Sequence, residues 1–471
     1  MKKKYFLFLT CLLCFQFSGA QVFEVETIQY KGSSDKFINI VIMGDGYTAS
    51  QQDLFITKAT DFANSLTNIT PWSNYKNYFN IYAIKVISNE SGAIHPNTAS
   101  DCNTANPPVP VSNPDNYFKT QFDYAEIHRL IVPTGEARIA SVLAANVPDY
   151  DQLIIIANSS DYGGSGGSYA TTTTHPAGVE ITAHEMGHSF ANLADEYYAG
   201  DQYFFERPNM TAQSNPATNK WRNWLTTGTG ISIQNYCCGG NSASWYKPTT
   251  NSCKMEILGV PYCAVCKEGI IERVHSLVNP IVAYEPETLN IESTQQFLNF
   301  NLSELMLPVP NTLNIKWQLD GAVLSNTSAN YQLDQTTLTN GIHTLSATVT
   351  DDTTLIRVDN HAAVHASVVT WNINKTSLGI NAVASDSQIS YAVYPNPASN
   401  IATIELDLRK NSTLSVDLIS ADGKVLQHLK SKTAAAGKYK ETINIEKLAS
   451  GTYFIAVKID GVVHSKTLVK E

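Results

Sequence analysis

The sequence predicts an α/β domain followed by two modules built of β-strands. In residues 21–281, strand-like apolar runs alternate with helix-like runs, which is the pattern of an α/β layer architecture. In residues 282–385 and again in residues 386–471, apolar and polar residues alternate and turn signals separate the runs. With 471 residues the chain is too long for a single domain. We therefore expect three domains with these boundaries.

Composition narrows the class of protein. The chain is 43% hydrophobic and 16% charged, so it can bury several cores and is not a disordered chain. Its net charge of −10 and the lack of a basic patch argue against a nucleic-acid partner.

The N-terminus has the three parts of a secretory signal peptide. Lysines at positions 2–4 precede an apolar run over 5–17, and small residues end at Ala20. We expect residues 1–20 to be removed on export. This apolar run is too short for a transmembrane helix, and no later run is long enough.

The first domain opens with strands that alternate with a helix. Residues 37–43 read as a buried strand ended by a Gly-Asp-Gly turn, and residues 50–66 have the apolar spacing of a helix. Further strands are predicted at 80–87 and 152–157.

A glycine-rich segment and two helices complete that domain. Residues 163–174 begin flexible and become extended, and a helix begins near Val179. The extended part, around Tyr169–Thr173, could pair with an extended peptide by strand addition, or be a surface loop. A second helix follows Cys266 and is stopped by Pro280.

The two C-terminal modules show strand alternation most clearly. Residues 312–319 and 342–349 alternate in polarity, and Asp-Gly and Asn-Gly turns follow or precede them, as in an antiparallel sandwich. Residues 282–385 contain no cysteine, so no disulfide can form there.

The pattern His-Glu-x-x-His occurs at His184, Glu185 and His188. On a helix, residues four apart lie on one face, so both imidazoles can bind one metal ion. A catalytic Zn²⁺ needs a third protein ligand and keeps one position for water. The alternative is an ordinary helix with a polar face, but apolar neighbours would make unpaired imidazoles costly there. We expect one catalytic Zn²⁺; a structural Ca²⁺ site cannot be read from the sequence.

Asp195 and Glu196 are the candidates for the third ligand. In a continuous helix, Asp195 would lie roughly 10 Å beyond His188, too far to share its metal. The chain must therefore turn after His188. Asn192 is the residue best suited to a left-handed turn there, and in the metzincin clan the third ligand comes three residues after such a turn. This places Asp195 as the predicted ligand and Glu196 as the alternative.

The segment His184–Tyr197 resembles the active-site motif of the IgA-peptidase family of secreted zinc metallopeptidases. Residues 43–47, 252–255 and 261–266 also resemble that family, and the resemblance covers about residues 22–280. It implies a metzincin-like fold in which Met255 is the Met-turn residue beneath the zinc. The alternative for Met255 is a filler of the core.

The same resemblance implies a secreted zinc endopeptidase that hydrolyses peptide bonds of extracellular proteins. Its zinc-bound water would be activated by Glu185 as general base. The founding member acts on immunoglobulin A, and this substrate does not transfer; the substrate and the substrate-binding residues are unknown. The alternative function is a surface adhesin on a peptidase-like scaffold.

Six of the eight cysteines lie outside the signal peptide: Cys102, Cys237, Cys238, Cys253, Cys263 and Cys266. An even count in an exported chain predicts up to three disulfides. The alternatives are a redox pair at Cys263-x-x-Cys266, or a structural zinc site that adds Cys253 and Cys237.

The last module resembles the C-terminal sorting domain of proteins exported by the type IX secretion system. The residues that carry this resemblance are Val393–Ala398, Ala421–Lys424 and Gly451–Phe454. It implies the type IX machinery as a partner and a final location outside the cell, either released or attached to the cell surface.

Overall fold

The computed structural model describes residues 21–102, 110–200, 205–376 and 391–471. The predicted signal peptide and the boundary at residue 385 lie outside the described residues. Within these ranges, no helix has both the length and the apolar character needed to cross a membrane.

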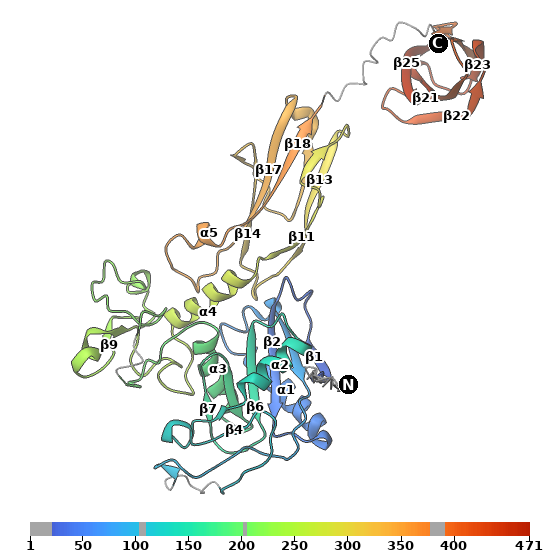
Figure 1. The fold of residues 1–471 in the computed structure, drawn as a ribbon. Coiled ribbons are helices and arrows are strands. Elements are labelled where there is room, and N and C mark those ends of the chain that lie inside the picture. The colour runs from blue at the N-terminus through green and yellow to red at the C-terminus, as the bar shows by residue number, and fades with distance from the viewer. Residues whose placement is uncertain (1–20, 103–109, 201–204, 377–390) are drawn as a thin grey trace, which may run out of the picture. The chain divides into compact units, whose positions relative to one another are not determined.

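The N-terminal region is built on a six-stranded sheet of order β1-β3-β2-β6-β8-β7 (Figure 1). Its strands are β1 Val25–Gln29, β2 Ile38–Asp45, β3 Phe79–Ile84, β6 Gln152–Ala157, β7 Gly164–Ser165 and β8 Ala170–Thr173. The inner neighbours β3, β2, β6 and β8 run parallel, while β1 and β7 pair antiparallel at the two edges. All eight residues of β2 are buried, as expected for a central strand covered on both faces.

Helices cover both faces of this sheet. They are α1 Gln52–Leu66, α2 Glu136–Asn146, α3 Gly178–Ser189 and α4 Ala264–Leu277. Because side chains alternate along a strand, Ile40 and Ile42 of β2 share a core with α1, α3 and α4, whereas Val41 and Met43 pack with α2. The predicted strands at 37–43, 80–87 and 152–157 and the helix at 50–66 are confirmed as β2, β3, β6 and α1.

Short elements lie in the loops of this region. The strands are β4 Thr120–Gln121, β5 Val132–Pro133, β9 Gln234–Asn235 and β10 Tyr246–Lys247. The 3₁₀ turns are Ala49–Gln51, Lys76–Tyr78, Tyr124–Glu126, Arg222–Trp224 and Gly240–Ser244.

The next part of the chain is dominated by β-strands. They are β11 Ile281–Glu285, β12 Asn290–Glu292, β13 Phe297–Leu305, β14 Leu313–Leu319, β15 Ala322–Val323, β16 Asn330–Asp334, β17 Gly341–Asp351 and β18 Ser367–Lys375, with a 3₁₀ turn at Gln335–Thr337 and the short helix α5 His361–Val364. Strands β14, β17 and β18 are neighbours in one sheet, and β13 lies in another. Phe300 of β13 contacts Trp371 of β18, which stacks on Trp317 of β14, so the two sheets pack face to face.

Polar contacts join these strands to the helical layer. The Tyr75 hydroxyl donates to Asp351 Oδ2 at 2.6 Å, and His275 of α4 lies 3.2 Å from the same oxygen. Glu272 of α4 pairs with His361 at 2.7 Å and with His365 at 2.8 Å. The described residues from 21 to 289 accordingly form one compact unit with Asn299–Gln332 and Thr344–Asn372.

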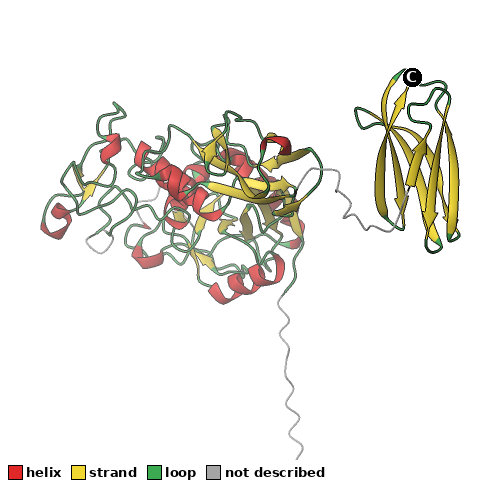
Figure 2. Cartoon of the chain, turned by 90° about the horizontal axis from the view of Figure 1, so that it is seen from above, coloured by secondary structure: helices red, strands yellow, loops and turns green. Residues whose placement is uncertain are grey.

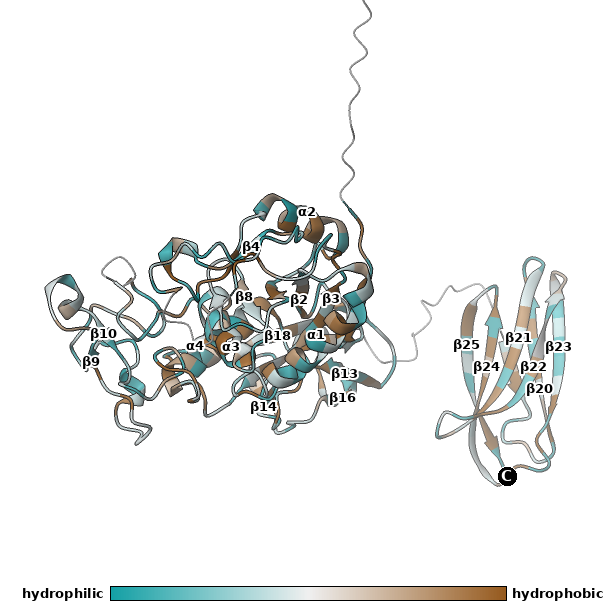
Figure 3. Ribbon diagram, turned by 90° about the horizontal axis from the view of Figure 1, so that it is seen from below, coloured by the Kyte–Doolittle hydropathy of each residue, from teal (hydrophilic) through white to brown (hydrophobic). Residues whose placement is uncertain are grey.

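The C-terminal module has a separate core. Its strands are β19 Tyr391–Tyr394, β20 Ile401–Leu408, β21 Ser412–Ser420, β22 Val425–Ala434, β23 Gly437–Asn444, β24 Gly451–Ile459 and β25 Val462–Lys470. They form sheets of order β19-β20-β23 and β22-β21-β24-β25, and Figure 2 shows strands and loops only in its described part. Alternate residues of β20 and β21 are buried, which appears as hydrophobic and hydrophilic bands along the strands in Figure 3. The fold is thus mixed α/β and rich in sheets, as predicted.

Candidate metal centre

Helix α3 carries the His-Glu-x-x-His motif and ends directly after it. Asn192 has φ of 55°, the left-handed conformation expected from the sequence. The amide of Leu193 donates to the carbonyl of Gly187 at 2.9 Å, and that of Asn192 donates to the carbonyl of His188 at 3.0 Å. This is a left-handed helix cap, and it turns the chain back toward the histidines.

The turn brings Asp195 to both imidazoles. Asp195 Oδ1 lies 3.1 Å from His184 Nε2 and 3.2 Å from His188 Nε2, and the two Nε2 atoms are 3.2 Å apart. Tetrahedral Zn²⁺ with ligands at 2.0–2.1 Å requires separations of about 3.3 Å between ligand atoms. The three atoms therefore fit one face of a zinc tetrahedron.

Backbone carbonyls fix the orientation of both imidazoles. His184 Nδ1 lies 2.9 Å from the carbonyl oxygen of Lys254, and His188 Nδ1 lies 2.8 Å from that of Leu193. Each Nδ1 must carry the proton to donate to a carbonyl, which leaves each Nε2 with a free lone pair. This arrangement of imidazole and hydrogen-bond acceptor is common around protein-bound zinc.

The electrostatics of the cluster favour a cation. Burial alone would lower the pKa of His188, but the hydrogen bond and charge of Asp195 raise it to about 9. Burial would raise the pKa of Asp195, but hydrogen bonds from His184 and His188 hold it well below its usual value. The carboxylate thus keeps its negative charge between two imidazoles, where a metal ion can take the place of a proton.

Glu185 lies beside these atoms, in a cleft of about 500 Å³. Burial raises the pKa of its carboxyl group, although the histidines act in the opposite direction. A Cβ added to Gly166 would lie 2.4 Å from Glu185 Oε2, so the chain passes very close to this carboxylate. The other cleft residues include Ile127, Arg129, Leu130, Tyr162, Ile181, Tyr197, Ile257 and Leu258.

Met255 lies against the helix at the midpoint of the motif. It is fully buried, and a Cβ added to Gly187 would be 2.6 Å from its sulfur. The carbonyl of Met255 accepts from the amide of Glu196 at 2.8 Å, and that of the preceding Lys254 faces His184. The segment therefore supports the helix and the returning chain together.

Glu196 points away from the histidines into another cluster. Its carboxylate accepts from Asn209 at 3.0 Å and from Thr249 at 2.9 Å, and lies 3.1 Å from the Cys266 sulfur. Cys253 and Cys263 complete this buried group. Of the two carboxylates considered from the sequence, the structure brings only Asp195 to the histidines.

The sequence predicted up to three disulfides. In the described part of the chain one disulfide is present, between Cys237 and Cys238. Cys102, Cys253, Cys263 and Cys266 are free and buried. Cys253, Cys263 and Cys266 lie together with Glu196. This group differs from the structural zinc site considered from the sequence in that Glu196 stands in the place of Cys237.

The sequence left two interpretations open for the segment around Tyr169–Thr173, a strand that adds a peptide or a surface loop, and the structure shows it as β8 with a neighbouring strand on each side. Strand β8 pairs with β6 on one side and with β7 on the other. Even β7 is partly covered, because the amide of Gly164 donates to the carbonyl of Arg129 at 3.1 Å.

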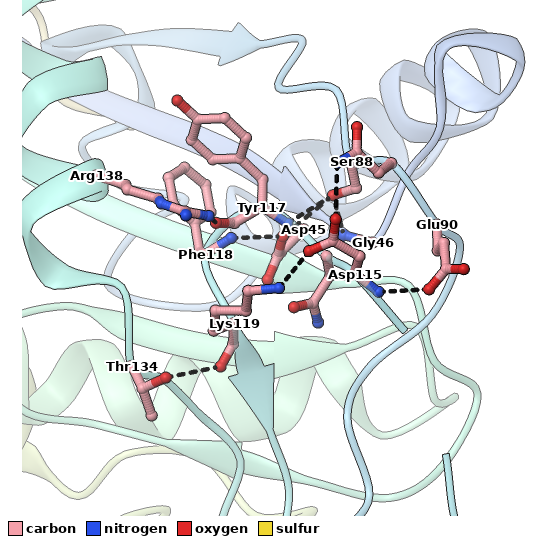
Figure 4. Close-up of polar contacts among 12 residues, drawn as sticks. Asp45, Gly46, Ser88, Glu90, Asp115, Tyr117, Phe118, Lys119, Thr134 and Arg138 are labelled. Carbon is pink, nitrogen blue, oxygen red and sulfur yellow. Dashed lines mark hydrogen bonds and ion pairs between the residues drawn. The ribbon is translucent and has the colours of Figure 1, made fainter. Parts of the chain in front are cut away.

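The motif at residues 43–47 has a structural role away from the metal centre. Figure 4 shows Asp45, at the end of β2, receiving hydrogen bonds from the loop that passes beside it. Asp45 accepts from the amides of Phe118 and Thr120 at 3.0 Å each and from the Ser88 hydroxyl at 3.3 Å. Asp45 therefore joins the chain around Ser88 and around Phe118 to the carboxyl end of the central strand β2.

Residues 127–130 of the cleft were not predicted from the sequence. They lie in an irregular segment between β4 and β5, which carries no periodic signal. The sequence contained one indication that this segment has a function: Asp123 and His128, two potential metal ligands, lie close together in it.

The left-handed turn allows a direct test of how Asp195 is positioned. We expect Asn192→Gly to keep zinc and fold, because glycine adopts positive φ without strain. Asn192→Val should be destabilised by roughly 1–2 kcal/mol and bind zinc more weakly, because a β-branched residue disfavours this conformation. Thermal unfolding and zinc content of the two variants measure this. Equal zinc affinity in both, at equal fold, would show that the turn does not position Asp195.

Comparison with known families agrees with the site. Residues 26–236 match the family model described as IgA Peptidase M64, and residues 392–471 match that of the secretion system C-terminal sorting domain. The first match identifies a peptidase, which is a hydrolase, and the family implies a metal ion. The chain thus carries a domain of the M64 peptidase family, and its type IX sorting domain marks it as secreted or located at the cell surface.

Other comparisons add little. The search of curated proteins gives no match. Among solved structures, latent PorU from Porphyromonas gingivalis is 15% identical over 33% of this chain and 16% of that chain, with a TM-score of 0.16. The fibronectin(III)-like modules of Clostridium thermocellum CbhA are 13% identical over 40% of this chain and 93% of that chain, with a TM-score of 0.17. TM-scores this low support no conclusion about fold or function.

Proposed function

We propose that the protein is a zinc-dependent endopeptidase that cleaves extracellular proteins, with His184, His188 and Asp195 as zinc ligands. The observation that carries this proposal is the set of three ligand atoms 3.1–3.2 Å apart, with the Glu185 carboxylate beside them in an open cleft. We further propose that Met255 is the Met-turn residue of a metzincin-like domain, since it lies under the helix between the two histidines.

The chemistry follows from the positions of the side chains. A bound zinc ion supplies Lewis-acid chemistry, polarising the scissile carbonyl and making water more acidic. Glu185 accepts the proton of the attacking water, and its raised pKa suits it to return that proton to the leaving amine. Tyr197 stacks on His184, with ring centres 6.3 Å apart, and limits the space at the ligand. Apolar cleft residues such as Ile181 and Leu258 offer contacts to substrate side chains.

The domain organisation belongs to the same proposal. A signal peptide at 1–20 directs export, residues 21–281 form the catalytic domain, and residues 282–385 form a sandwich. Residues 386–471 form the sorting module, which hands the chain to the type IX machinery. The contacts of Glu272 with His361 and His365 support the view that the sandwich braces α4.

The alternative is an adhesin on a peptidase-like scaffold. Such a protein has no need of a general base, and its ligand and base positions are free to change. The sequence retains every one of these groups, and the structure brings them together, which supports the enzyme.

Digestion of a broad peptide library, read by mass spectrometry, tests this function. We expect internal cleavage that a zinc chelator abolishes and added zinc restores. A bound but uncut library would support the adhesin. Cleavage that persists in metal-free protein would contradict the zinc mechanism.

A further inference from the structure

A second group of potential metal ligands lies in the loops on either side of β4. It consists of His95, Cys102, Asp123 and His128. The side chains of His95, Cys102 and Asp123 are at least nine-tenths buried, and that of His128 is partly buried. None of these residues belongs to the zinc motif, and their positions in the sequence are 7, 21 and 5 residues apart.

The four ligand atoms lie at the corners of a tetrahedron. His128 Nδ1 is 3.2 Å from His95 Nε2 and 3.0 Å from Asp123 Oδ1. Cys102 Sγ is 3.3 Å from Asp123 Oδ1, 3.6 Å from His128 Nδ1 and 4.0 Å from His95 Nε2. The last edge, from His95 Nε2 to Asp123 Oδ1, is 3.4 Å. Zinc bound by nitrogen, oxygen and sulfur at ordinary distances requires edges of about 3.3–3.6 Å.

Hydrogen bonds alone do not account for this arrangement. His95 Nδ1 lies 3.1 Å from the carbonyl oxygen of Pro110, so it carries the ring proton and leaves Nε2 as an acceptor. Asp123 Oδ1, a carboxylate oxygen, is also an acceptor. The cluster thus offers two acceptors and at most two donors, Cys102 and His128, for six close contacts. A divalent cation at the centre would satisfy all four atoms at once.

The surroundings hold the ligands in place. Asp123 Oδ2, the oxygen outside the cluster, accepts from the amide of Thr98 at 2.9 Å. The amide of His128 donates to Asp101 Oδ1 at 2.8 Å. Asp123 itself has φ of 67°, a left-handed conformation that directs its side chain inward. Such support outside the ligand set is typical of protein metal sites.

We propose that His95, Cys102, Asp123 and His128 bind a structural zinc ion. Imidazole, thiolate and carboxylate together favour Zn²⁺ over the oxygen-preferring Mg²⁺ and Ca²⁺. Four protein ligands leave no position for substrate, which distinguishes a structural from a catalytic site. Binding also protects Cys102, a free thiol in an exported protein, from oxidation.

This zinc would shape the wall of the catalytic cleft. Ile127, Arg129 and Leu130 line the cleft and flank the ligand His128. The carbonyl of Arg129 also accepts from Gly164 of the edge strand β7. The ion would therefore join the loop around Cys102 to the segment that faces the substrate. This role rests on the proposed function, whereas the existence of the site does not.

Two measurements test the site. Crystals of the full protein, grown with zinc, are measured above and below the zinc absorption edge; we expect an anomalous peak within bonding distance of all four atoms. Cys102→Ser keeps a hydrogen-bond donor but removes the soft ligand, and Asp123→Asn removes the charge. Each should contain one zinc per chain fewer than the parent protein after dialysis against a weak chelator. The matched control is Asp61→Asn, which changes an exposed carboxylate on α1 outside the ligand set and its supporting contacts and should keep the parental zinc content.

The outcomes separate this site from the catalytic one, because the anomalous peaks lie at different residues. A peak at His184 without one at Cys102 overturns the structural zinc and leaves the peptidase proposal intact. Folded Cys102→Ser and Asp123→Asn proteins with parental zinc content overturn it as well. If neither variant folds, the anomalous data on the parent protein decide.

Discussion

Glu185→Gln should reduce peptide cleavage by about 10²–10⁴-fold or more while the fold and the bound zinc are retained. Glutamine keeps the shape of the side chain but cannot accept a proton, and general-base catalysis is typically worth this much. Glu185 lies in the cleft beside the ligand cluster rather than within it, so its loss leaves the three ligand atoms in place. Burial raises the pKa of its carboxyl group, which also makes the neutral glutamine well tolerated there.

The measurement compares cleavage rates of the zinc-loaded parent and variant on one peptide found in the library digestion. Circular dichroism and zinc content are recorded for both. A merely structural role for Glu185 predicts that activity and stability fall together. Equal rates at equal zinc content would mean that another group acts as the base, or that a contaminating peptidase produces the cleavage.

Helices and strands with a clear apolar spacing could be predicted from the local sequence. The apolar run of β2, interrupted only by Asn39, predicted a buried strand, and the apolar spacing of residues 50–66 predicted the helix α1. At the candidate site, the turn at Asn192 followed from its steric tolerance for positive φ, and the structure has that conformation. In these cases the deciding interaction lies within a few residues of the signal.

Long-range contacts decided the features that the sequence did not reveal. Nothing local to Glu196 indicates that it will meet Cys253 and Cys266, which are more than 50 residues away. In the same way, the sequence did not decide between a peptide-binding strand and a surface loop around Tyr169–Thr173, because the pairing of β8 with β7 depends on a short hairpin through Gly166. Clusters assembled from separate loops have no sequence period and emerge only when the fold is known.

The adjacent carboxylates of Asp195 and Glu196 lie in different surroundings. Asp195 faces the two histidines, and the next residue, Glu196, is fully buried among cysteines on the other side of the returning chain. Burial raises the pKa of Glu196 well above the usual value, whereas the histidines hold that of Asp195 below it. Position, rather than chemical type, therefore separates the proposed ligand Asp195 from the buried group Glu196.

Asp195→Ala should raise the zinc concentration needed for activity by more than about 100-fold, whereas Glu196→Gln should leave it near the parental value. The estimate is a lower bound, because losing a supporting group outside the ligand set already costs 10–100-fold in affinity. The protein is stripped with a chelator, and the zinc concentration that restores half of the maximal cleavage is measured. This reactivation reports the catalytic site alone, even if the cysteine cluster also binds metal. Glutamine at position 196 can still accept from Asn209 and Thr249, so the fold should survive, as thermal unfolding would show. A large shift for Glu196→Gln with none for Asp195→Ala would reject the ligand set proposed here.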